Sequence, residues 1–113
     1  MPGKFEIKTA SNGKFFFNLK AGNGEVILSS QMYKAKPYAL RGIASVKKNA
    51  VDDARYEVRD SANGEQFFVL KAGNSQVIGK SETYPTKQAL QKGIASVKKN
   101  APEASIVEIA PKA

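Results

Sequence analysis

Two different hydrophobic periods follow one another along this chain. Residues 4–9, KFEIKT, alternate apolar and polar side chains, a pattern typical of a half-buried strand. Residues 14–20, KFFFNLK, are rich in side chains that favour strands. After Tyr33 the period becomes helical, because four apolar residues fall on one face of a helical wheel. The pattern therefore predicts strands followed by a helix. The apolar residues of that helical face are Ala39, Ile43, Val46 and Ala50.

This order of elements occurs twice. The nonapeptide GIASVKKNA stands at residues 42–50 and returns unchanged at 93–101. A shift of 51 residues aligns the two halves without a gap, and half of the aligned pairs are identical. The opening pattern Phe5-Glu6-Ile7 appears a third time as Val107-Glu108-Ile109. We therefore predict a single compact domain spanning residues 1–113. Its internal repeats are 3–53 and 54–103, with a partial third repeat, the closing strand, at 104–110.

Turns that contain glycine join the predicted strands into three-stranded meanders. A two-residue Asn-Gly turn after the first strand would bring charged residues onto the apolar side of the hairpin. A three-residue loop at 11–13, with Gly13 in the left-handed conformation, instead pairs Ile7 with Phe17 and Phe5 with Leu19. We therefore predict the three-residue loop.

The next turn, at residues 22–23, is expected to pair Leu19 with Val26. The second repeat has Gly79 where the first has Leu28, which predicts that its meander is less well filled.

Within the helices, Gly42 and Gly93 each cost about 1 kcal/mol relative to alanine. We therefore expect the sheet or the other helix to approach closely at these two positions. Thr86 is expected to cap the second helix, whereas the first repeat has Ala35 at the matching position and no such cap.

The stretches LKAGNGEVI, Y-x-x-K and GIASVKKNA resemble the YegP-like family of small bacterial proteins, over essentially the whole chain. The resemblance implies a β3-α-β unit used twice, as tandem repeats or as two subunits, in one antiparallel sheet with exchanged terminal strands. It implies no established activity and no catalytic residue. The predicted fold is α+β: two tandem β-β-β-α units plus a closing C-terminal strand, forming one antiparallel sheet with two helices packed on one face. Because two joined units already supply each other's partner, we expect a monomer.

The composition restricts the chemistry. The chain has no cysteine and no histidine, which removes thiolate chemistry and the most frequent general base and metal ligands. We therefore expect a protein that is not an enzyme and holds no cofactor or metal. The apolar runs fall far short of the roughly 20 residues of a membrane helix, and the opening MPGKFEIK lacks the apolar stretch of a secretory signal. We expect a cytoplasmic protein without a membrane partner.

Three short patterns suggest chemistry only weakly. Ser45 and Lys48 form an S-x-x-K pattern, repeated at residues 96 and 99, but no companion motif of the serine acylases accompanies it. AGNGE resembles a phosphate-binding loop but lacks the G-K-[ST] ending, and its copy reads AGNSQ, so a hairpin turn is the better interpretation. The repeated glutamates are expected to pair with lysines across the strands. They are Glu6, Glu57 and Glu108.

The formal net charge of +8 gives the first functional hypothesis. A positive field attracts polyanions, and it also keeps a protein soluble. On the outward face of each helix two basic residues stand seven positions apart, and they are our candidate polyanion-binding residues. Solvation and the helix dipole also explain lysines near a helix C-terminus without any ligand. These candidates are Arg41, Lys48, Lys92 and Lys99.

The sheet face away from the helices gives a second candidate surface. Phe16 and Phe67 are predicted to point to that side, where aromatic rings interleaved with cations would stack bases and hold phosphates. The same patch also fits a protein interface or burial by curvature of the sheet. We therefore predict a basic, non-catalytic binding module for a polyanion such as nucleic acid, with a protein-interaction module as the alternative. The cations expected on this side are Lys8, Lys20, Arg59 and Lys71.

Overall fold

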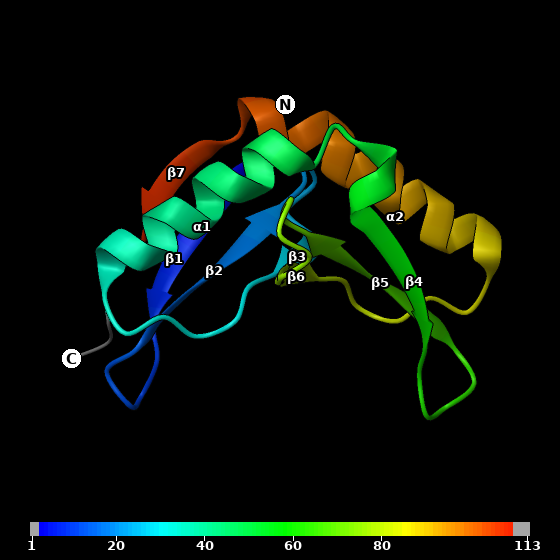
Figure 1. The fold of residues 1–113 in the computed structure, drawn as a ribbon, viewed down its shortest axis with the longest axis horizontal. Coiled ribbons are helices and arrows are strands. Elements are labelled where there is room, and N and C mark those ends of the chain that lie inside the picture. The colour runs from blue at the N-terminus through cyan, green and yellow to red at the C-terminus, as the bar shows by residue number, and fades with distance from the viewer. Residues whose placement is uncertain (1–2, 110–113) are drawn as a thin grey trace.

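The two repeats fold into one sheet that carries both helices on the same side (Figure 1). The structure is a computed structural model and describes residues 3–109. It confirms the α+β fold with two tandem strand-strand-strand-helix units. Within residues 3–109 no helix has the length and apolar character of a bilayer-spanning segment. The elements are β1 Lys4–Thr9, β2 Phe15–Lys20, β3 Val26–Ser29, α1 Lys36–Asn49, β4 Tyr56–Asp60, β5 Gln66–Lys71, β6 Val77–Lys80, α2 Lys87–Asn100 and β7 Ser105–Glu108, with short 3-10 helices at Asp53–Arg55 and Ala101–Glu103.

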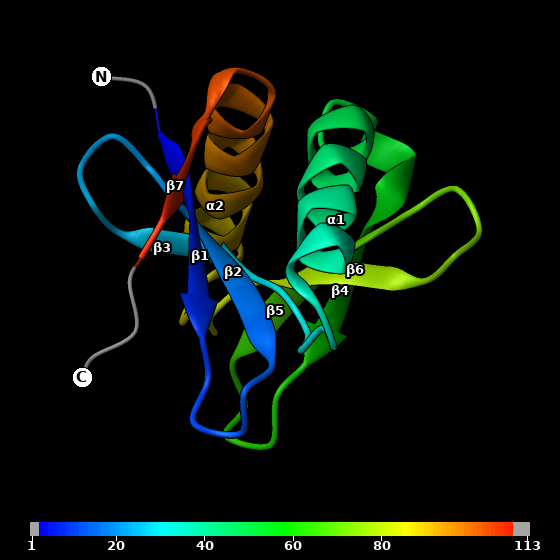
Figure 2. The ribbon, with the colours of Figure 1, turned by 90° about the vertical axis from the view of Figure 1, so that its left-hand side faces the viewer.

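The strand order places the two meanders back to back. Over the described part of the chain the order is β4-β5-β6-β3-β2-β1-β7, so the repeats meet at β3 and β6 like the two halves of a dimer. A single residue pair, Ser29 with Lys80, joins these two strands in the ladder. The helices stand next to each other over the sheet (Figure 2), and each contacts strands of the other repeat: α1 contacts β5 and β6, and α2 contacts β3. Side-chain packing therefore contributes much of what joins the halves.

The C-terminal segment enters the sheet as predicted, but its direction was not foreseen. β7 pairs with β1 in parallel, from Lys4 opposite Ser105 to Ile7 opposite Glu108. The sheet is therefore mixed, and the expectation of an antiparallel sheet throughout is wrong at this edge. The physical reason is the connection: five strands and both helices separate β1 from β7 in the chain, so no hairpin constrains the pair to be antiparallel. Residue 110 of the predicted closing strand lies outside the described residues.

The first hairpin has the predicted register. Ile7 lies opposite Phe17, and Phe5 lies opposite Leu19. Gly13 has a φ of 81°, the left-handed conformation that the three-residue loop requires. All four apolar side chains are buried in the core beneath the helices.

The register predicted for the second hairpin is wrong. Leu19 lies opposite Leu28 instead of Val26, and Lys20 lies opposite Val26. The turn is another three-residue loop, closed by the Ala21 N–H that donates to the Glu25 carbonyl at 2.9 Å. A bulge after Leu19 then shifts the ladder by one residue. This bulge is not visible in the alternation of apolar residues.

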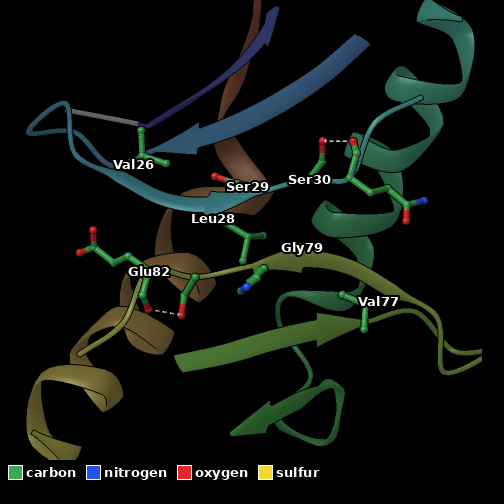
Figure 3. A pocket seen from close by; sticks show the side chains of 10 residues that line it. Val26, Leu28, Ser29, Ser30, Val77, Gly79 and Glu82 are labelled. Atoms are coloured by element: carbon green, nitrogen blue, oxygen red, sulfur yellow. Dashed lines mark hydrogen bonds between the residues drawn. The ribbon is translucent and has the colours of Figure 1, made fainter. Parts of the chain in front are cut away.

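The corrected register brings Leu28 to the seam between the repeats. Its side chain points from β3 towards Gly79 on β6 (Figure 3), and it is 1% exposed. A Cβ atom on Gly79 would lie 2.5 Å from Leu28 Cδ2. The prediction that Gly79 leaves its meander poorly filled is therefore wrong, because the leucine of the other repeat fills the space. These two residues are equivalent positions of the repeats, and the seam has room for one side chain.

Gly42 and Gly93 do have a close neighbour, and it is a tyrosine ring that stacks on the sheet. Tyr84 stacks on Phe68 with ring centroids 6.2 Å apart and presses against Gly93, where a Cβ atom would lie 2.6 Å from Tyr84 Cζ. Tyr33 packs against Gly42 in the same way. The expectation that the sheet itself approaches is met in part, through Phe68. The duplicated nonapeptide is therefore a packing element that receives these tyrosines.

Gly93→Ala should lower the free energy of unfolding by about 1–3 kcal/mol, because the added methyl overpacks against Tyr84 by more than helix propensity gains. Ala95→Gly, at an exposed position of the same helix, is the matched control and should cost about 1 kcal/mol through propensity alone. Urea unfolding of both variants gives the comparison. A Gly93→Ala chain more stable than the original would contradict the close packing.

Candidate functional site

Glu6 gathers three lysines on the sheet face away from the helices. Its carboxylate oxygens lie 3.0 Å from Lys20 Nζ, 3.6 Å from Lys4 Nζ and 3.9 Å from Lys8 Nζ. Burial raises the pKa of the Glu6 carboxyl, but the hydrogen bond from Lys20 and the charges of all three lysines outweigh it and hold the pKa below its usual value. A buried glutamate thus holds three cations around itself.

The second repeat repeats this arrangement in a more open form. Glu57 accepts a hydrogen bond from Lys71 Nζ at 2.6 Å and another from Arg59 Nε, and both hold the pKa of its carboxyl below the usual value. All four cations expected to contact a ligand on the sheet face, Lys8, Lys20, Arg59 and Lys71, therefore have a glutamate partner.

The apolar side chains near the sheet face differ in their burial. Ile27, Val69 and Ile78 lie within the buried core, whereas Phe16 and Phe67 remain half-buried. Lys80 Nζ lies 4.7 Å from the centroid of the Phe67 ring. Of the alternatives for this patch, burial therefore applies to these three residues, and the two phenylalanines do not form a continuous stacking platform with them.

The helices carry the other predicted surface. Each helix has four lysine or arginine residues and neither has an aspartate or glutamate. The four predicted residues Arg41, Lys48, Lys92 and Lys99 are all exposed, and none of them forms an ion pair within residues 3–109. We call the exposed faces of α1 and α2 the helix layer.

One hollow brings two of these residues together with a turn of the other repeat. Lys92 and Lys99 line a depression of about 550 Å³ with Ser96 and the turn at 21–23. This neighbourhood could not be found from sequence, because α2 and the turn belong to different repeats and come together only across the seam. It presents two cations beside a hydroxyl group and a polar turn.

The S-x-x-K pattern does not bring its serine to the lysine. Ser45 Oγ accepts a hydrogen bond from Asn49 Nδ2 at 3.2 Å, and the same amide donates to the Ser45 carbonyl at 2.8 Å. Ser96 and Asn100 form the identical arrangement. The serine and asparagine thus belong to the last turns of the helices. Within residues 3–109, histidine, cysteine, aspartate and glutamate side chains form no group of three that would hold a metal ion.

Sequence reasoning missed a pocket at the seam. This pocket has a volume of about 470 Å³, and equivalent positions of the two repeats line it in pairs, among them Val26 with Val77 (Figure 3). The hydroxyl groups of Ser30 and Ser81 at its rim already bind backbone groups. The signal for this pocket in the sequence was the Leu28 and Gly79 difference, which marks the positions that meet there.

A family model described as "Domain of unknown function (DUF1508)" matches the chain twice, over residues 10–57 and residues 61–108. The chain belongs to this family. Each DUF1508 match begins before a hairpin turn and ends in the strand that follows a helix, which is β4 in the first match and β7 in the second. The family unit is therefore β-β-α-β, and β1 precedes the first unit.

Relatives of this DUF1508 chain are similar over nearly their whole length. A UPF0339 protein of Acinetobacter baylyi is 51% identical over 109 residues, covering 96% of this chain and 98% of the relative. UPF0339 protein YegP of Escherichia coli is 50% identical over 100 residues, covering 88% and 91%. The solution NMR structure of Escherichia coli yegP, described as a protein of unknown function, matches with a TM-score of 0.91 and 44% identity, covering 100% of this chain and 97% of that one. The YegP-like resemblance is thereby confirmed.

The lysine cluster around Glu6 predicts a pH dependence of stability. Because the folded-state pKa of Glu6 lies below the reference value of 4.5, its contribution is complete above that pH and is lost as the pH falls through the lowered pKa. Glu6→Gln should therefore cost about 1 kcal/mol near neutral pH, and the difference from the original chain should vanish in acid.

Glu103→Gln is the control and should cost little at any pH, because Glu103 is exposed and forms no ion pair within residues 3–109. Urea unfolding of the three chains across the acid range gives the measurement. A Glu6→Gln cost that does not depend on pH would mean that the charge of Glu6 contributes nothing.

Proposed function

We propose that this chain is a non-catalytic binding module whose helix layer binds a polyanion, and we favour nucleic acid as the class. The observation that supports the proposal most is the sorting of charge between the two sides of the sheet. The sheet-face cations surround glutamates, whereas the helices contain cations and no acid. A surface with one sign of charge concentrates polyanions of the opposite sign.

The chemistry of the helix layer favours contacts with phosphate groups over the reading of bases. Its exposed charged side chains are chiefly lysines, which hold phosphates as flexible point charges. Tyr38 is the large aromatic residue exposed on α1, and the Arg41 guanidinium lies 5.6 Å from its ring centroid. Binding through this layer is therefore expected to depend strongly on salt and weakly on sequence. The proposal includes a cytoplasmic location and a monomeric state, and both fit this role.

A protein-interaction module is the second candidate function. The observation that favours it is the outer edge of β4, which has no neighbouring strand in the described sheet. An open edge binds extended chain segments through backbone hydrogen bonds.

The variant that tests the helix layer changes Arg41, Lys48, Lys92 and Lys99 to glutamine together. It should fold nearly as well as the original, because exposed substitutions usually change stability by about 0.5 kcal/mol or less each. Its affinity for a single-stranded and a double-stranded oligonucleotide should fall, and the slope of log affinity against log salt should flatten by up to about 0.9 for each lost phosphate contact.

The matched control removes the same number of charges elsewhere, by changing Lys4, Lys14, Lys34 and Lys80 to glutamine; all four are exposed and lie outside the helices. The control should lose less affinity and retain most of the salt slope. Equal losses in the two variants would mean that net charge acts without a site. Absence of binding by the original chain at low salt would reject the proposal itself.

A further inference from the structure

The repeat symmetry of the sheet is broken at one edge. The strands β1, β2 and β3 of the first repeat correspond in position to β4, β5 and β6 of the second. The outer side of β1 is covered by β7, but β4 is the last strand at its end of the described sheet (Figure 1). The described sheet thus has no equivalent of β7 beside β4. This absence follows from the connectivity, because the segment after α1 forms β4 itself.

The backbone of β4 is arranged to accept a strand at that edge. At the covered edge, the Ile109 N–H donates to the Ile7 carbonyl at 2.8 Å, so the backbone groups of Ile7 face β7. The equivalent of Ile7 is Val58, which lies opposite Phe68 just as Ile7 lies opposite Phe17. The backbone N–H and C=O of Val58 therefore face outward, away from β5.

The apolar side chains of β4 are more exposed than their equivalents on β1, as expected for an edge that no strand covers. Ile7 is 1% exposed beneath β7, whereas Val58 is 45% exposed. Phe5 is buried, but its equivalent Tyr56 is only partly so. A hollow of about 510 Å³ lies between β4 and α2, and Tyr56, Val58 and Ile94 contribute its apolar wall. An apolar side chain from an added strand would enter this hollow.

A lysine near the outer edge of β4 is placed to pair with an acidic residue of an added strand. At the covered edge, Lys36 at the start of α1 forms an ion pair with Glu108 of β7. Its equivalent at the start of α2 is Lys87, which is exposed and forms no ion pair within residues 3–109. Lys87 also lines a second hollow, of about 620 Å³, with Gln88, Gln91 and Lys92. A strand on β4 with an acidic residue at the position of Glu108 would meet this lysine.

We propose that the outer edge of β4 is a docking site for an extended peptide segment of another protein, which adds to the sheet in parallel with β4. Its recognition pattern copies Ile106 and Glu108 of β7: an apolar residue opposite Tyr56, followed two positions later by an acidic residue opposite Val58. The two share the side of the strand that faces the helices, because side chains alternate along a strand. Within residues 3–109, a second copy of this chain offers no free strand of this pattern, since its own β7 already lies on β1.

The experiment uses a fluorescent peptide with the sequence of residues 101–109, APEASIVEI, as the probe, and the full chain as the receptor. Fluorescence anisotropy should show saturable binding. A peptide that carries lysine in place of the glutamate copied from Glu108, with the other glutamate kept, should bind about 3- to 10-fold more weakly to the original chain. The Lys87→Glu receptor should reverse this preference. Lys80→Glu, on the opposite side of the sheet, is the charge control and should leave the preference unchanged.

Val58→Pro tests the backbone contact, because proline removes an N–H that faces outward on an edge strand. This receptor should lose peptide binding while circular dichroism shows that it remains folded; if it does not fold, the reversal of preference by Lys87→Glu decides. Binding that persists with Val58→Pro in a folded chain, or that ignores Lys87→Glu, would overturn the proposal, since the peptide would then lie elsewhere, for example in place of β7 on β1. Absence of saturable binding at millimolar peptide would also overturn it. A dimer in light scattering that Val58→Pro converts to monomer would overturn it in favour of a second copy at this edge.

Discussion

The fold depends on a single constraint at the seam, where two equivalent positions of a duplicated sequence meet and only one side chain fits. A dimer of identical units would bring the same residue to both sides of its axis. A tandem duplication can differ there, and this chain has Leu28 on one side and Gly79 on the other, with the leucine in the space above the glycine. In the described sheet only one ladder pair joins β3 to β6. The packing of Leu28 on Gly79 and the contacts of each helix with strands of the other repeat therefore contribute much of the stability of the association between the two repeats. The pocket at the seam and the hollow beside Lys92 both result from it.

What the sequence predicted correctly is local or repeated. The hairpin at 11–13 followed from a choice between two registers, of which one placed charges in the core, and the Thr86 cap follows from chemistry within one turn, where its hydroxyl accepts from the Ala89 N–H at 3.1 Å. What it did not predict depends on contacts between distant segments. The bulge after Leu19 leaves no trace in the alternation, and the parallel direction of β7 depends on where α2 ends in space. Tyr33 and Tyr84 stand at equivalent positions of the two repeats, but nothing in the sequence showed that their rings pack against Gly42 and Gly93.

The two repeats carry their charged residues at largely equivalent positions. Each repeat begins with a strand whose glutamate pairs with basic residues of its own strand and of the next strand, so Glu6 and Glu57 offset part of the positive charge of the sheet face in parallel ways. The helices contain no acidic residue, and the excess positive charge of the chain is therefore located on them. The two copies are not equal at the edges, since in the described sheet β7 covers β1 and no strand covers β4. The proposed polyanion surface rests on the helix cations, which have no acid within the helices, and the proposed peptide site rests on the outer edge of β4.

The most direct test of this account exchanges the two residues at the seam and measures the free energy of unfolding of four chains in urea. Gly79→Leu alone should overpack the seam and cost about 1–3 kcal/mol or more, and Leu28→Gly alone should leave a cavity and cost about 3–5 kcal/mol. The double exchange restores one leucine facing one glycine, so it should recover most of both losses, with a coupling of at least about 2 kcal/mol. A double variant as unstable as the sum of the two single variants would contradict the claim that the seam requires one large and one small residue.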